Sequence, residues 1–343
     1  MIKLTSLLSI AAVATLASAQ PARANTEIRL ATLAPSGSPW MEVLGKAQAE
    51  IKAKTGGRVT LKYYEGGQQG DERDFVRKIG AGQLDGAAIT SIGLSMIDES
   101  IRVLELPMMF ESVEELDYVA DKMWPYFQKK FEKKGFKLND RGDVGWVYFM
   151  SKSKVSSMAD LKGQKLWMWG DDLIVTTMFR KLNVNGVPLG VPEVDAALTA
   201  GRINAVYASP LASVALQWNT KVKYMTSMPM SYAIGATVMS LKSIEKVSAE
   251  DRKLVETIAK NASKKLRKVI RKANEDAKTT MTRKGITIVP TPVGMVDEFR
   301  KQAQDAWTEL VGKLYTKEEL DMVLKYRKEF REKKGGATKA AAR

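Results

Sequence analysis

The chain has 343 residues, no cysteine and no histidine, and a formal net charge of +15. Without cysteine it can form no disulfide or thiolate site, and without histidine it lacks the Ser-His-Asp relay and the usual imidazole ligands of zinc. Most of the positive charge falls on residues 252–284 and 325–343, so the rest is close to neutral. A basic stretch without interleaved aromatic residues is typical of a solvated face, so we expect no nucleic-acid partner.

Residues 1–24 have the order of an export signal. Lys3 precedes the apolar run LTSLLSIAAVATLASA, and the segment Ala22-Arg23-Ala24 fits a small-x-small cleavage site. A membrane anchor needs about 20 apolar residues, and this run is shorter and interrupted by serine and threonine. We therefore predict a cleaved signal peptide, a mature start near Asn25 and a periplasmic location.

Strands and helices alternate in the first part of the mature chain. Strands are predicted over residues 27–33, 58–65 and 84–90, and helices start after the capping residue Ser38 and at Asp71. The connections between these elements are short. Such a β-α-β-α-β order favours half of a doubly wound α/β sheet.

The same alternation returns in residues 161–218. The predicted elements there are a strand at 165–169, a helix at about 172–182, a strand at 186–188, a helix started by Pro192 and a strand at 203–208. Parallel strands in this order open at their carboxyl ends onto a crevice. A second α/β lobe with a ligand crevice is therefore expected.

Three further segments concern the connection of the lobes and the end of the chain. Residues 145–150 and 233–241 are predicted as strands that pass between lobes. Residues 248–285 form one uninterrupted helical pattern, which is unusually long for a globular protein. Residues 333–343 are predicted as a disordered tail.

Several phrases of the sequence are similar to one known family. AKTGGRVTLKYYEGGQQGDERDFVRKIGAGQLDGAAIT, VLELPMMF and Asp160-Leu161-Lys162-Gly163 occur in the order and spacing of the DctP-type periplasmic solute-binding proteins of TRAP transporters. The resemblance covers most of residues 27–310. It implies a two-lobed periplasmic-binding-protein-like α/β fold, with crossing strands and a long C-terminal helix that spans both lobes.

The resemblance also implies a function and a division into lobes. The protein would capture a small organic solute by lobe closure and deliver it to TRAP membrane permease subunits, as a monomer or homodimer. Lobe I would comprise residues 25–145 plus about 234–265. Lobe II would comprise residues 146–232 plus about 266–332.

Two positions depart from the family pattern. The family arginine that binds the substrate carboxylate is implied to fall at Trp167, and a second arginine at Val147. Tryptophan has no charge and a single donor, so it cannot replace a guanidinium. One hypothesis is a ligand less polar than a plain dicarboxylate. The other is an organic acid held by another group, such as Lys165, Arg73 or the amides of residues 36–38 and 90–91.

We predict ligand contacts at residues near strand ends and helix starts: Ser38, Trp40, Glu72, Ser91, Phe110, Trp167, Trp169 and Tyr207. No catalytic residue, metal or cofactor is expected. Because a fold does not by itself separate receptors from enzymes, a periplasmic enzyme that modifies a small molecule in the same cleft is the alternative. Turnover of the ligand would distinguish the two.

Overall fold

The computed structural model describes residues 25–170 and 172–341, with side chains as far as residue 334. The predicted signal peptide, residues 1–24, lies outside the described residues. The strands are β1 Thr26–Thr32, β2 Val59–Tyr64, β3 Gly86–Thr90, β4 Phe136–Leu138, β5 Gly142–Ser151, β6 Leu166–Trp169, β7 Gly186–Leu189, β8 Ala205–Ala208, β9 Tyr224–Thr226, β10 Ser231–Ser240 and β11 Thr287–Val289.

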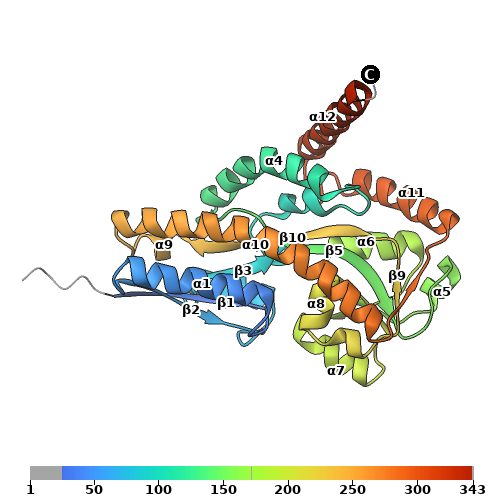
Figure 1. Ribbon diagram of the computed structural model, residues 1–343, viewed down its shortest axis with the longest axis horizontal. Coiled ribbons are helices and arrows are strands. Elements are labelled where there is room, and N and C mark those ends of the chain that lie inside the picture. The colour runs from blue at the N-terminus through green and yellow to red at the C-terminus, as the bar shows by residue number, and fades with distance from the viewer. Residues whose placement is uncertain (1–24, 171, 342–343) are drawn as a thin grey trace, which may run out of the picture.

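Helices connect and cover these strands (Figure 1). The α-helices are α1 Pro39–Lys54, α2 Glu72–Gly80, α3 Ser91–Ser95, α4 Val113–Lys133, α5 Met158–Lys162, α6 Leu173–Leu182, α7 Val194–Thr199, α8 Pro210–Ala215, α9 Leu241–Ile244, α10 Ala249–Arg283, α11 Val293–Glu309 and α12 Lys317–Ala341. The 3-10 helices are η1 Glu99–Glu105, η2 Val191–Glu193 and η3 Trp218–Thr220.

The sheet has two parallel groups of strands with antiparallel strands between them. Its order is β2-β1-β3-β10-β5-β8-β6-β7. β1 is parallel to β2 and β3, and β6 is parallel to β7 and β8, whereas β10 and β5 are antiparallel to each other. We call the group around β1 with α1–α4 lobe I, and the group around β6 with α5–α8 lobe II. β5 and β10 connect the two, so the predicted two-lobed fold with crossing strands is confirmed.

Local signals in the sequence set the starts of the helices that frame the crevice. Ser38 is the N-cap of α1, and Pro39 occupies the first helical position. Asp71 caps α2, where it forms a capping box with Asp74. Asp172 caps α6. The caps at Ser38 and Asp71 were predicted from the sequence, because capping depends on residues within one helical turn.

The long helix α10 spans both lobes. It starts after the N-cap Ser248 and packs against α1 of lobe I and α8 of lobe II. In Figure 1 it runs across most of the length of the molecule. Asn274 of α10 donates to the carbonyl of Val144, beside the point where the register of β5 and β10 shifts. Within the described residues, neither α10 nor another helix has the length and apolar character that crossing a membrane requires.

The C-terminal region differs from the expected division. Residues 266–332 were assigned to lobe II, and α11 does pack against α6. α12, however, packs against α4 of lobe I, and Trp307 and Val323 belong to the same buried cluster as Phe127 of α4. The sequence shows an apolar stripe here, but it does not show which lobe will cover that stripe.

The segment expected as a disordered tail also differs. Residues 333–341 continue helix α12, and residues 342–343 lie outside the described residues. The prediction rested on the position of this segment at the end of the chain. Its lysine and alanine residues, however, favour helix.

Candidate functional site

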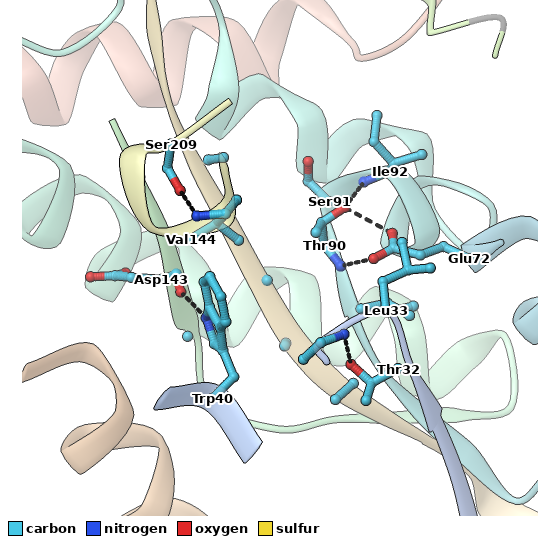
Figure 2. Close-up of a pocket in the computed structure, with 18 of the residues that line it drawn as sticks. Thr32, Leu33, Trp40, Glu72, Thr90, Ser91, Ile92, Asp143, Val144 and Ser209 are labelled. Atoms are coloured by element: carbon cyan, nitrogen blue, oxygen red, sulfur yellow. Dashed lines mark hydrogen bonds between the residues drawn. The ribbon is translucent and has the colours of Figure 1, made fainter. Parts of the chain in front are cut away.

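A cavity of about 310 Å³ lies where the two lobes meet at the crossing strands. Its walls come from β1, β2, β3 and α1 of lobe I, from β6, α6, β8 and α8 of lobe II, from β5 and β10, and from the long helix α10. Figure 2 shows Trp40 and Asp143 on one side of this space and Thr90 and Ser91 on the other. Most of the lining residues are apolar, as is usual for a small-molecule site.

Six of the eight predicted contact residues line the cavity: Trp40, Glu72, Ser91, Trp167, Trp169 and Tyr207. Ser38 and Phe110 are not among its lining residues. The buried Ser38 side chain accepts the amide of Met41 as the cap of α1. Phe110 is 7% exposed and packs in the core of lobe I. Both lie close to the site in sequence, but packing turns their side chains away from it.

Glu72 holds the turn between β3 and α3. Its carboxylate accepts hydrogen bonds from the amide and the hydroxyl of Thr90, each at 2.8 Å (Figure 2). It also accepts one from the amide of Gly93 at 2.8 Å. The side chain is buried, and this burial raises the pKa of Glu72 to about 7, although the bonds from Thr90 and Gly93 oppose the shift. Glu72 therefore positions the turn that carries Thr90 and Ser91.

A buried charged cluster adjoins Ser91. The Ser91 hydroxyl is hydrogen-bonded to Glu105, and Glu105 lies 3.5 Å from the Nε of Arg102. The Nη2 of Arg102 donates to Asp172 of lobe II at 2.8 Å. Burial raises the pKa of Glu105, and the nearby Arg102 opposes that shift.

Sequence reasoning missed Arg102 and Glu105, both of which line the cavity. The available signal was a pair of opposite charges three residues apart inside the apolar run IRVLELP. Charged side chains are rarely buried unless they are paired, so a charged pair in such an apolar run indicates a buried ionic interaction.

The lobe II wall is aromatic. Trp167 stacks on Tyr207 with ring centres 4.9 Å apart, meets Trp218 edge-on at 5.1 Å and lies beside Trp169 at 5.8 Å. Trp167 is only 2% exposed, and its indole nitrogen donates to the carbonyl of Leu189 at 3.0 Å. Its only donor is therefore already used within lobe II, so Trp167 can offer a ligand ring surface but no hydrogen bond.

Direct contacts join the lobes at the mouth of the crevice. The carboxylate of Asp71 in lobe I accepts the Trp169 indole at 3.1 Å and the Val191 amide at 2.8 Å, both from lobe II. The Arg73 guanidinium lies against Gly170. A Cβ added at Gly170 would be 2.9 Å from the guanidinium carbon of Arg73. These contacts describe a closed arrangement of the two lobes.

The structure also shows where the two positions lie at which the family resemblance implies an arginine. Val147 and Trp167 both line the cavity, so both implied arginine positions hold apolar side chains at its wall. Lys165 is exposed and Arg73 lies at the Gly170 contact, and neither is among the described residues that line the cavity.

Comparison with known proteins gives one family and several related structures. The model of bacterial extracellular solute-binding protein family 7, DctP, matches residues 30–316. The uncharacterized protein YiiZ of Salmonella typhimurium is 25% identical over 244 residues, which are 68% of this chain and 72% of that protein.

Two solved structures resemble the fold across nearly their whole length. The sugar acid binding protein DctPAm of Advenella mimigardefordensis, in complex with galactonate, has a TM-score of 0.84 and 18% identity, and the match covers 89% of this chain and 99% of that one. A TRAP periplasmic solute-binding protein of Xanthobacter autotrophicus with bound β-D-galacturonate has a TM-score of 0.81 and 20% identity. The match covers 88% of this chain and 99% of that one.

Proposed function

Since the chain belongs to bacterial extracellular solute-binding protein family 7, the DctP family, we propose that it is the periplasmic receptor of a TRAP-type transporter. It closes its two lobes over a small organic solute and delivers that solute to membrane permease subunits. One observation carries this proposal: a cavity of about 310 Å³ is lined by both lobes and by the strands that connect them. A ligand that contacts both lobes binds the closed state better than the open one.

The alternative of an enzyme in the same cleft has no support. The family is one of solute-binding proteins. Of the carboxyl side chains that line the cavity from lobe I, Glu72 and Glu105 are occupied in hydrogen bonds with Thr90, Gly93 and Ser91.

The ligand is less polar than a plain dicarboxylate. The structural relatives from Advenella and Xanthobacter hold galactonate and galacturonate. In this chain the two implied arginine positions are Val147 and Trp167, and aromatic rings surround the second. An aromatic wall favours solutes with ring or alkyl surface, because such surface is removed from water on binding.

The test is a thermal-shift screen of the mature protein against a broad library of metabolites, followed by X-ray scattering with each solute that binds. We expect at least one small organic solute to raise the melting temperature and to keep the radius of gyration at or below that of the free protein. The solute should be recovered unchanged. Catalytic conversion of the solute, or no stabilisation across the library, would refute the receptor assignment.

A further inference from the structure

Arg102 is in an unusual position for a buried cation. It is 5% exposed, and among the described residues that line the cavity it is the one arginine or lysine. Five carboxyl side chains line the same cavity: Glu72, Glu105, Asp140, Asp143 and Asp172. Of these, Asp143 is paired outside the cavity with Arg141 and Arg271. The remaining lining charges are therefore mostly negative.

The charge of Arg102 is already balanced from within the protein. Its Nη2 is 2.8 Å from the Oδ2 of Asp172, and its Nε is 3.5 Å from the Oε2 of Glu105. The side chains of these two carboxylates are 4% and 8% exposed. A ligand carboxylate at Arg102 would bring a further negative charge into a buried cluster that has one cation for two anions, and burial makes such an imbalance costly.

One donor of Arg102 nevertheless forms no hydrogen bond in the described part of the chain, although a carboxylate oxygen of Glu105 lies 3.5 Å from it. Its Nε is buried and forms no hydrogen bond within the described residues. The Nε of Arg141 is also buried without a hydrogen bond, but Arg141 is not among the lining residues of the cavity. An unsatisfied buried donor is unfavourable, and an oxygen acceptor placed beside it recovers that loss.

We propose that Arg102 binds an uncharged oxygen acceptor of the solute, such as the carbonyl of an amide, lactam or ester, while Asp172 and Glu105 exclude free carboxylates. The ligand is then a neutral molecule whose acceptor meets Arg102 and whose apolar part lies against the aromatic wall. This inference rests on the proposed receptor function and names the class of its solute.

The test uses pairs of probes that differ only in charge: benzamide and benzoate, and cyclohexanecarboxamide and cyclohexanecarboxylate. Binding to the mature protein is measured at pH 8 by titration calorimetry, where both acids are ionised. We expect each amide to bind at least about tenfold more tightly than its acid, since a carboxylate adds an unpaired buried charge. Tighter binding of the acids, or no binding of any probe, would overturn the proposal.

Asp172→Asn provides a variant that should weaken the preference for the amides. Asparagine is as good an N-cap as aspartate, so α6 keeps its start, while Arg102 loses one of its two neighbouring anions and keeps Glu105. The ratio of acid to amide affinity should rise by about tenfold. The matched control is Asp85→Asn, which removes a buried carboxylate paired with Arg29 at 2.8 Å outside the cavity and should leave the ratio unchanged. An unchanged ratio in Asp172→Asn would refute the proposal.

Arg102→Lys tests the donor separately from the charge. Lysine retains a cation for Asp172 but has no Nε–H, so the affinity for the amides should fall by about tenfold. An unchanged amide affinity would show that another group binds the acceptor. Binding of an acid from the metabolite library would overturn this inference and leave the receptor function intact, whereas conversion of a bound solute would overturn the receptor function itself.

Discussion

The two walls of the cavity are held in place by different forces. On the lobe I side, Glu72 and Glu105 are buried carboxylates whose oxygens accept hydrogen bonds from the turn and strand that they support. On the lobe II side, Trp167 and Tyr207 are fixed mainly by contact between rings. Hydrogen bonds are directional and depend on charge, whereas ring packing depends on shape and area.

The two lobes therefore present different kinds of surface to the cavity. The lobe I wall presents polar groups of defined direction, with Arg102 and Ser91 at the cavity. The lobe II wall presents a rigid apolar surface whose polar atoms are already paired, as for the indole nitrogen of Trp167. The polar wall should therefore respond to pH, and the aromatic wall should respond to loss of volume.

The largest effect is expected on the aromatic wall. Trp167→Ala removes a side chain that is 2% exposed and in contact with three other rings. Its removal should lower the free energy of unfolding by about 3–5 kcal/mol, as for other buried aromatic truncations. Guanidinium unfolding followed by circular dichroism measures this loss. The half-buried Trp40 serves as a control, and Trp40→Ala should cost less. If Trp167→Ala weakened binding but left stability unchanged, Trp167 would be a ligand contact and not a core residue.

A smaller effect is expected on the polar wall, and it depends on pH. The pKa of Glu72 is raised to about 7, so the folded state favours the protonated carboxyl. Its contribution is fully present below the ordinary pKa near 4.5 and is lost as pH rises towards 7, by up to about 3 kcal/mol. Stability should therefore fall across this window in the wild type and less so in Glu72→Gln.

Urea unfolding of both proteins between pH 4.5 and 8 measures this difference. The chain has no histidine, so no imidazole titration is superimposed on the window. Glu105, whose pKa is also raised, remains in both proteins and cancels in the comparison. Parallel curves for the two proteins would show that Glu72 stays charged in the fold.

The smallest effect is expected where the two walls meet. Asp71→Ser retains an N-cap for α2, but the shorter side chain cannot reach Trp169 and Val191. Loss of these charged hydrogen bonds should weaken closure by about 1–2 kcal/mol. X-ray scattering of the free protein should then give a larger radius of gyration than the wild type. Equal radii would mean that Asp71 does not hold the lobes together.

Four of the predicted contacts that line the cavity come from a local pattern that marks a strand end. Trp167, Trp169 and Tyr207 follow from the alternation of two strands, and Ser91 follows from the end of β3. Phe110 does not line the cavity and packs in the core, because the sequence gives its apolar character but not the direction of its side chain. The charged pair in the run IRVLELP was a local signal for Arg102, but its contact with Asp172 could not be predicted, because that residue is 70 positions away.

The sequence by itself determined the order of strands and helices, the caps of α1 and α2, the crossing strands and the family to which the chain belongs. These features depend on residues within a few positions of one another, or on phrases preserved along the chain. Only the tertiary structure decided that α12 returns to lobe I and that Arg102 reaches the cavity with its charge balanced by Asp172. The physical reason is that such contacts join distant segments, and their geometry is set when the two lobes pack around β5 and β10.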